Sequence, residues 1–145
     1  MEEDDHGIEI RRVKPGDERL FDRVADDVFD YTIDPKILVE YLAEPNHHLI
    51  VALHDGVVIG QCAAVVHKHP DLRATELYID EVAVAPEFQR GGIAQRMLDA
   101  AFALGKALGC EQAWVGTEPG NLPARGLYAS RRVLAENLVM YVFEL

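Results

Sequence analysis

The sequence predicts a single-domain α/β fold in which helices flank a mixed central sheet, and three observations support this prediction. Some stretches alternate between apolar and polar residues, as strands do. Between them lie stretches whose apolar residues recur every three or four positions, as in amphipathic helices. The Asp55-Gly56 pair between two apolar stretches is a strong hairpin signal. A strand over 76–84, a helix over 91–108 and a strand over 111–117 have the order of a parallel crossover unit.

The N-terminal third is expected to hold one strand and two helices. Alternating apolar residues suggest a strand over 8–13, which ends before Pro15-Gly16. Apolar residues spaced by three and four then predict an amphipathic helix over 17–31. A second, shorter helix is expected over 35–43, because its apolar residues share one face.

Three strands are expected in the middle of the chain. The strands over 48–53 and 57–67 are joined by the Asp55-Gly56 turn, whose residue types suit a two-residue hairpin loop. A long strand follows over 76–84, and Pro86 ends it because proline cannot donate to a strand ladder.

The C-terminal third is expected to alternate between helix and strand. The helix over 91–108 carries a long apolar stripe and ends at Gly109. A strand over 111–117 and a short helix over 122–130 follow, and a last strand over 138–143 closes the chain. The full expected order is β-α-α-β-β-β-α-β-α-β.

Composition and charge narrow the function classes. Apolar residues make up 49% of the 145 residues and charged residues 27%, which is typical of one globular domain and not of a disordered or fibrous chain. No apolar run approaches the ~20 residues of a membrane span, so no membrane partner is expected. The net charge of −11 disfavours non-specific nucleic-acid binding and favours a cationic or amine-bearing partner. The alternative is that this charge serves solubility alone.

The N-terminal residues and the cysteines indicate where the domain begins and in which compartment the protein resides. Residues 1–7 are acidic, unlike a signal or transit peptide, so we expect a flexible, solvated tail before a domain over 8–145. Cys62 and Cys110 lack the spacing of a metal or redox motif and are expected to be buried free thiols. This cysteine usage predicts a cytoplasmic protein.

The segment between the expected strand 76–84 and the expected helix 91–108 has the chemistry of an anion-binding loop. Gly91 and Gly92 permit backbone conformations and close approaches that a Cβ atom blocks. The helix that follows directs unpaired N–H groups and the positive end of its dipole at the loop, and Arg90 adds a positive charge. The alternative is a tight turn that needs glycine for packing alone.

This loop resembles the acetyl-CoA loop of the Gcn5-related N-acetyltransferase (GNAT) family, which reads Gln/Arg-x-x-Gly-x-Gly/Ala. The resemblance extends upstream over 78–84 and downstream to Asn121 and Leu127-Tyr128, so it covers about residues 8–145. It implies a GNAT fold whose sheet is splayed between strands 76–84 and 111–117. It also implies acetyl-CoA as the cosubstrate. The matching loop residues, which the resemblance assigns to cofactor binding, are Gln89, Arg90, Gly91, Gly92, Ile93 and Ala94.

Within this family the chain is most similar to the gentamicin 3-N-acetyltransferase group of aminoglycoside-modifying enzymes. The segments that carry this narrower resemblance are 76–84, 117–121 and 139–145. They imply an aminoglycoside-like or polyamine-like acceptor and a role in antibiotic resistance. One departure is that Arg131-Arg132 stand where family members usually carry a glycine that turns the chain.

The resemblance also implies roles for single residues. The pantetheine arm of acetyl-CoA would pair with backbone groups near Val82, Ala83 and Val84, and a free N–H near Val84 would polarise the thioester carbonyl. Asn121 would bond the pantetheine amide. Tyr128 would donate a proton to the leaving thiolate. A half-buried core tyrosine is the alternative for Tyr128.

Glu81 and Asp80 are the candidate general bases, because the substrate ammonium must lose a proton before it attacks. Strict alternation puts Glu81 on one face with Leu77 and Ile79 and Asp80 on the other face. A bulge, which this strand usually has in the family, would shift that phase. We prefer Glu81, since the aminoglycoside group tends to carry an acidic residue there. A salt-bridged edge carboxylate is the alternative.

Further acidic residues are candidates for binding substrate ammonium groups. They are Asp80, Glu118 and the Asp26-Asp27 pair, each of which has solvated surface as its alternative. Trp114 is expected in the core. His67 and His69 share a strand face but lack a third ligand, so no metal is expected.

These observations predict direct acetyl transfer from acetyl-CoA to a primary amine. Two alternatives stay open: a peptide or protein amine as the acceptor, or a non-catalytic, regulatory CoA-binding module whose acceptor site is altered by Arg131-Arg132. The sequence does not determine the oligomeric state, and we keep a homodimer open.

Overall fold

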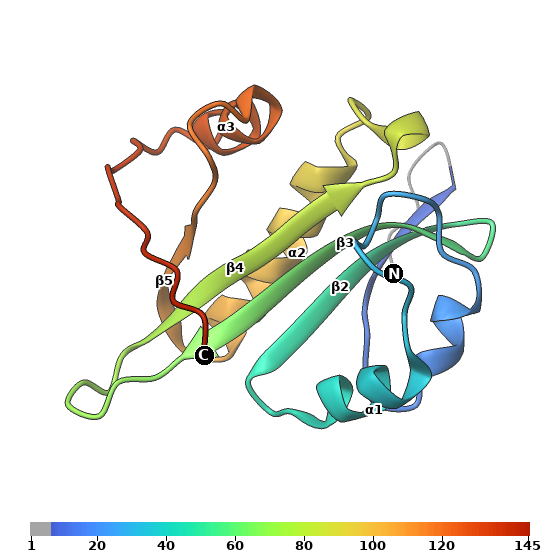
Figure 1. The fold of residues 1–145 in the computed structure, drawn as a ribbon, viewed down its shortest axis with the longest axis horizontal. Helices are drawn as coiled ribbons and strands as arrows, with labels where there is room; N and C mark the ends of the chain where they lie inside the picture. Colours follow the sequence, from blue (N-terminus) through green and yellow to red (C-terminus); the bar gives the residue numbers. More distant parts are fainter. Residues whose placement is uncertain (1–6) are drawn as a thin grey trace.

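The structure of the protein, a computed structural model, describes residues 7–145 and contains one five-stranded sheet (Figure 1). The strand order is β1-β2-β3-β4-β5. Neighbours from β1 to β4 are antiparallel, whereas β5 is parallel to β4. The strands are β1 (Ile8–Arg12), β2 (His47–His54), β3 (Val57–His67), β4 (Thr75–Val84) and β5 (Cys110–Val115).

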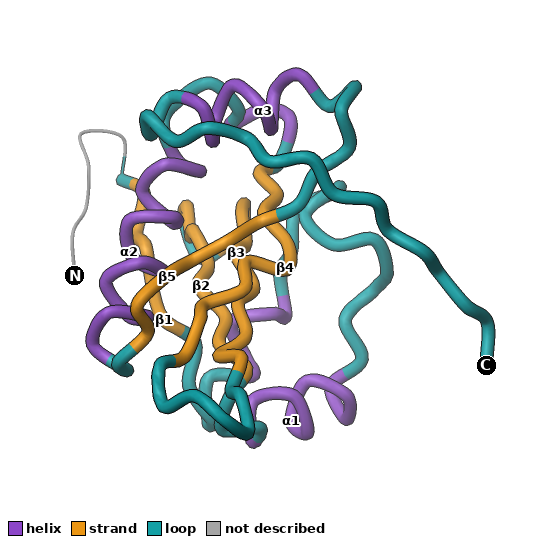
Figure 2. Tube along the Cα trace, turned by 90° about the vertical axis from the view of Figure 1, so that its left-hand side faces the viewer, coloured by secondary structure: helices purple, strands orange, loops and turns teal. Residues whose placement is uncertain are grey.

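Three α-helices accompany the sheet. They are α1 (Pro35–Ala43), α2 (Ile93–Ala107) and α3 (Leu122–Ala129). Helix α2 connects β4 to β5, so the predicted parallel crossover is confirmed. Figure 2 shows that α2 and α1 lie on opposite sides of the sheet, with α3 at one end of it.

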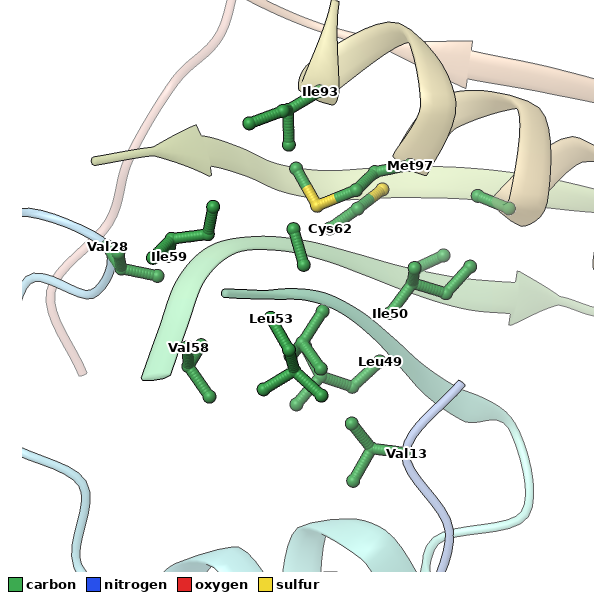
Figure 3. Close-up of a cluster of buried hydrophobic side chains, with 14 of the residues drawn as sticks. Val13, Val28, Leu49, Ile50, Leu53, Val58, Ile59, Cys62, Ile93 and Met97 are labelled. Atoms are coloured by element: carbon green, nitrogen blue, oxygen red, sulfur yellow. The ribbon is translucent and has the colours of Figure 1, made fainter. Parts of the chain in front are cut away.

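The core occupies both faces of the sheet (Figure 3). On one side Cys62 of β3 lies against Met97 and Ile93 of α2. On the other side Leu49 and Leu53 of β2 and Val58 of β3 gather with Val13 toward α1. A sheet whose two faces are both covered explains why β2 and β3 read as nearly continuous apolar runs.

Most predicted elements are present within one or two residues of their expected ends. Asp55 and Gly56 both have positive φ, of 50° and 76°, as a tight two-residue hairpin turn requires. Gly109 has a φ of 90° directly after α2, which confirms it as the stop of that helix.

The predicted helix over 17–31 is wrong. Only Glu18–Asp22 is helical, as a short 3-10 turn. The next residues bond to the start of β3 instead: the Val58 N–H donates to the Arg23 carbonyl, and the Ala25 N–H donates to the Val58 carbonyl. This part of β3 extends beyond the end of β4, so its edge is free to form hydrogen bonds. The backbone groups of Arg23 and Ala25 bond to this edge and not to one another within a helix.

The predicted closing strand over 138–143 is also wrong. In the described part of the chain these residues belong to no strand, and their side chains are exposed to solvent. Trp114 is not a core residue either, because it is 44% exposed on β5.

The acidic tail predicted over 1–7 lies, except for Gly7, outside the described residues. Among the helices of residues 7–145, none combines the length and the apolar character that crossing a bilayer requires.

Candidate active site

The site is built where β4 and β5 separate. The two strands pair only from Thr75 to Ile79 of β4, and Val115 ends the pairing on β5. The rest of β4, up to Val84, continues without a neighbour on that side in the described chain. The sheet is therefore splayed at this point, as the resemblance implied.

The open edge of β4 presents backbone hydrogen-bonding groups. The Ala85 N–H donates to the Ile59 carbonyl at 2.8 Å, so the facing residues Gly60 and Val84 form a non-hydrogen-bonded pair. The N–H and C=O of Val84 therefore point away from β3, and by the two-residue period so do those of Val82. Ala83, by contrast, directs its backbone groups to Gln61 of β3.

A β-bulge decides which way the candidate base points. The register shifts at Asp80, because Glu81 faces Ala63 while Ile79 faces the next residue of β3. Leu77 and Ile79 lie on the α2 side, whereas the bulge moves Glu81 to the opposite side of the sheet. Strict alternation would have buried Glu81 under α2. The predicted phase shift is thus present in β4.

Glu81 lies in a half-buried and acidic environment. Burial raises the pKa of its carboxyl group, a hydrogen bond from Gln61 opposes this, and the charges of Asp30 and Asp80 raise the pKa further. A raised pKa makes the carboxylate a stronger base near neutral pH.

Beside Glu81 the irregular segment over 21–33 forms a hollow of about 370 Å³. Four carboxylates line it, and they belong to Asp22, Asp26, Asp27 and Asp30. The interaction of Asp30 with Glu81 connects this hollow to β4. Several negative charges around one hollow attract a cation, which makes the hollow a favourable place for an ammonium group.

The loop after β4 leads into the N-terminus of α2. The Gln89 side chain donates from Nε2 to the Val84 carbonyl at 3.0 Å, so it ties the loop to the open end of β4. Arg90 and Gly92 both have positive φ, of 67° and 80°. Gly92 is the N-cap of α2, and no side chain caps the helix there. The N–H groups of its first turn, which begins with Ile93 and Ala94, are thus left for an anion.

We expect Gly92→Val to lower the affinity for CoA by about tenfold or more. A left-handed conformation costs a non-glycine residue about 1–2 kcal/mol, most for a β-branched one, so the loop would leave the conformation that aims its amides. Gly91→Ala should have the smaller effect, because Gly91 does not have the positive φ of Gly92 and a Cβ atom there lies 3.7 Å from the Phe88 carbonyl. Calorimetric titration with CoA measures both. Unchanged affinity in a folded Gly92→Val protein would contradict the loop assignment.

Helix α3 brings the candidate acid to the splayed strands. Asn121 is its N-cap, and its Oδ1 accepts from the Ala124 N–H at 3.2 Å. Tyr128 is half-buried, and burial, followed by the Cys62 thiol, raises the pKa of its hydroxyl group. Tyr128 packs against the hydrophobic core to which Cys62 of β3 also belongs. A raised pKa keeps the hydroxyl protonated and able to donate at neutral pH.

Arg131 and Arg132 preserve the turn for which glycine was expected. Arg132 has a φ of 63°, the left-handed conformation that favours glycine. Arg131 binds the Asp99 carboxylate at 2.6 Å and the Gln95 amide oxygen at 2.9 Å, and its guanidinium lies 5.1 Å from the centre of the Phe102 ring. These contacts hold the end of α3 to α2.

The remaining candidates lie at the surface. Asp80 occupies the bulge and is exposed, and Glu118 is exposed in the loop before α3. Across residues 7–145 no three His, Cys, Asp or Glu side chains are close enough together to hold a metal ion.

Sequence reasoning missed three residues around Glu81. Gln61 is fully buried, and its amide donates to the Val28 carbonyl at 3.3 Å. A glutamine inside an apolar run was the available signal. Tyr41 of α1 has a pKa raised to about 12 by burial, Asp80, Cys62 and Glu81. Asp30 belongs to the segment that was expected to be helical.

Comparison with known proteins adds to this geometry. A model of the acetyltransferase (GNAT) family matches residues 17–132. Uncharacterized N-acetyltransferases of Mycobacterium bovis and Mycobacterium tuberculosis are 24% identical to the chain over 100 residues. That match covers 69% of this chain and 61% of the length of those relatives.

Solved structures share the fold across nearly the whole chain. An aminoglycoside acetyltransferase from an uncultured soil metagenomic sample, in complex with sisomicin, has a TM-score of 0.82 at 22% identity, with 95% of each chain covered. AAC(6')-Iy, in complex with a CoA-acetylneamine bisubstrate analogue, has a TM-score of 0.77 at 19% identity, covering 95% of this chain and 99% of that one. A ribosomal-protein-alanine N-acetyltransferase from Brucella melitensis has a TM-score of 0.73 at 17% identity, with 95% and 99% covered.

Proposed function

Because the chain belongs to the acetyltransferase (GNAT) family, we propose that it transfers the acetyl group of acetyl-CoA to a primary amine of a polycationic small molecule. The observation that carries this proposal is the open edge of β4. It offers the outward N–H groups of Val82 and Val84, with the uncapped start of α2 at one end, and the half-buried Tyr128 of α3 packs against the core of the same domain.

The residues present fit acetyl-CoA as a substrate. The uncapped N-terminus of α2 and Arg90 suit a pyrophosphate, and the open edge of β4 suits the amide-containing pantetheine arm. The position where a Cβ of Gly92 would lie has no neighbouring atom within 4 Å, which leaves room for phosphate oxygens. Gln89 supports this site by fixing the loop rather than by touching the ligand. In the same way, Asn121 orients α3 through its cap.

The chemistry would be a direct transfer. Glu81, directly or through a water molecule, takes a proton from the substrate ammonium, and the free amine nitrogen forms a bond to the thioester carbonyl carbon. The outward N–H of Val84 stabilises the negative charge on the carbonyl oxygen. The carbon–sulfur bond then breaks, and Tyr128 protonates the thiolate, giving an acetamide and CoA. Holding both reactants at the splay supplies much of the acceleration.

The acidic hollow supports a polycation as the acceptor. Its four aspartates can attract several ammonium groups of one molecule, and the negative charge of Asp30 also reaches Glu81. We propose an aminoglycoside-like or polyamine-like acceptor, and within that class the gentamicin type acetylated at a 3-amino group. Aminoglycoside acetyltransferases among the similar structures support the broader class.

The experiment is an acceptor screen that follows the release of free thiol from acetyl-CoA. It compares aminoglycosides, spermidine, a monoamine and a peptide with a free N-terminus. We expect the polycations to have the highest kcat/KM. For an aminoglycoside product, the position of the new acetamide decides between a 3-amino group and another amine.

Salt provides an independent prediction for the same screen. Several carboxylate–ammonium contacts worth ~0.2–1 kcal/mol each are screened as the Debye length falls from about 30 Å at 0.01 M to about 3 Å at 1 M. The KM of a polycation should therefore rise about tenfold or more over this range, because about 1.4 kcal/mol corresponds to a factor of ten. The monoamine is the control and should change little.

Two outcomes would replace the proposal. A preference for the peptide amine with a salt-insensitive KM would make the acceptor a protein terminus and leave the charge of −11 to solubility. CoA binding without amine-dependent thiol release from any acceptor would make the chain a non-catalytic module.

A further inference from the structure

Gln61 of β3 is a polar side chain in a place where the sequence otherwise puts apolar ones. It interrupts the apolar run 57–66, and it is 0% exposed. The other polar residue that the described chain buries, His48, keeps an exposed fraction of 9%. A buried amide costs stability unless its hydrogen bonds are made. Packing alone therefore does not account for a glutamine at this position.

The hydrogen bonds of Gln61 are made by its amide nitrogen. Nε2 donates to the Val28 carbonyl at 3.3 Å, and the same side chain bonds to the Glu81 carboxylate. A backbone carbonyl and an ionised carboxylate can only accept, so both contacts need the N–H groups of the amide. Oε1 is buried and has no hydrogen-bond partner among the described residues. The side chain thus leaves its own acceptor unpaired while its donors face Val28 and Glu81.

The strand register explains how Gln61 reaches Glu81. Gln61 faces Ala83 across the sheet, and Ala63, two residues further along β3, faces Glu81. Gln61 and Glu81 are therefore diagonal neighbours on one face of the sheet, within reach of long side chains. The bulge in β4 puts Glu81 on this face, so the feature that moves it out from under α2 also brings it to Gln61.

Val28 connects this contact to the acidic hollow. It is fully buried, and it lies in sequence between Asp27 and Asp30, which line the hollow. The backbone of this segment and the carboxylate of Glu81 are thus held by one amide. The Gln61 side chain fixes the candidate base relative to the segment that carries the acidic residues.

We propose that Gln61 is a positioning residue for Glu81: its amide ties the carboxylate to the Val28 backbone and stabilises it in the form that accepts a proton. This inference rests on the proposed function, in which Glu81 takes a proton from the substrate ammonium. Because Gln61 is fully buried, it acts through Glu81 and not by touching a substrate.

Charged and titratable groups face Glu81 from the elements packed around it. They are Asp80 of β4, Asp30 of the acidic hollow and Tyr41 of α1. Burial and the charges of Asp30 and Asp80 raise the pKa of Glu81, whereas the hydrogen bond from Gln61 lowers it. Without the amide of Gln61, the pKa of Glu81 should therefore rise further.

The test variant is Gln61→Met, which keeps an unbranched side chain of similar length but has no N–H group. We expect the rise of kcat/KM with pH to move to higher pH by about one pH unit, a tenfold change in the ionisation constant. Gln61→Leu is a second apolar replacement and should move the rise in the same direction. Circular dichroism establishes which of the variants are folded.

Val51→Ala is the matched control for the loss of packing. Val51 faces Gln61 from β2 and is fully buried, so its truncation loosens the same part of the core but leaves the amide in place. We expect a lower melting temperature and the pH profile of the wild type. An equal displacement of the profile in Val51→Ala would overturn the proposal, because the effect would then follow from loosened packing.

Combining variants separates a role through Glu81 from a structural role. In the Glu81→Gln background, Gln61→Met should change kcat/KM by less than about twofold, since the group on which it acts is already gone. A loss as large as in the wild-type background would make Gln61 a structural residue and overturn the proposal.

A titration without catalysis distinguishes this inference from the proposed function. The carboxyl ¹³C resonance of Glu81, identified by its loss in Glu81→Gln, should titrate at higher pH in Gln61→Met than in wild type. If the titration moves but the wild-type protein transfers no acetyl group, the proposed function fails and the contact stands. If the titration does not move in a folded variant, or moves while the rate profile of an active enzyme does not, Gln61 does not position the base.

Discussion

Replacing Tyr128 by phenylalanine should lower turnover by about 10²–10⁴-fold, the usual contribution of general-acid help when proton transfer limits the rate. The half-buried hydroxyl has a raised pKa, so it is protonated at neutral pH and ready to meet a developing thiolate. Affinity for acetyl-CoA should stay nearly unchanged, because a proton donor acts mainly in the transition state. Steady-state kinetics and calorimetric titration with acetyl-CoA measure the two effects separately.

Tyr141→Phe is the matched control for this variant. It removes the same hydroxyl from an exposed position in the C-terminal tail and keeps the aromatic ring. We expect it to retain wild-type kinetics. If Tyr128→Phe also turns over at the wild-type rate, then Tyr128 is a packing residue and a water molecule protonates the thiolate.

Replacing Glu81 by glutamine should lower turnover by a similar ~10²–10⁴-fold, because the amide cannot accept the substrate proton. The wild-type rate should rise with pH through an apparent ionisation above the ordinary glutamate value of 4.5, since burial raises the pKa of Glu81. In Glu81→Gln this rise should disappear. A profile that keeps the same rise would assign the ionisation to the substrate amine or to another group.

Glu118→Gln serves as the comparison for Glu81→Gln. Glu118 is exposed and lies in the loop before α3, so a role in holding a cation would affect ground state and transition state about equally. We expect a higher KM for the amine with little change in kcat. An equal loss of kcat in both variants would contradict the separate roles proposed for them.

Stability should move in the opposite direction to activity in Glu81→Gln. The pKa of Glu81 is raised in the folded state, so ionising this group costs stability as the pH rises through the folded-state pKa. Glutamine removes that cost, and the variant should melt at a higher temperature than wild type at pH 7. The difference should shrink as the pH falls below 4.5, where the carboxyl group is protonated in both states. Thermal melts at the two pH values test this sign.

Several features of this protein were predicted from the sequence because local rules determine them. The Asp55-Gly56 turn, the end of α2 at Gly109 and the uncapped glycine start of α2 depend on backbone preferences of the residues themselves. The β4–α2–β5 crossover followed from the apolar periods of three adjacent segments. The loop at residues 89–94 was recognisable as a run of residue types for the same reason.

The side of the sheet on which Glu81 acts depended on an interaction beyond local sequence. A one-residue bulge at Asp80 reverses the face of every later residue of β4, and alternation within β4 contains no sign of it. The family resemblance suggested the bulge, but only the register against β3 locates it.

Two predicted elements did not form, because their formation depends on contacts with the rest of the fold. Residues 17–31 have helical spacing, yet the free edge of β3 at Val58 offers hydrogen bonds that the helix would otherwise make within itself. As a result the segment opens into the acidic hollow beside Glu81. Residues 138–143 would be apolar on both faces of a strand, but a strand forms only where a neighbouring strand pairs with it. The sequence determined what each segment prefers, whereas the structure decided which edges were free to receive them.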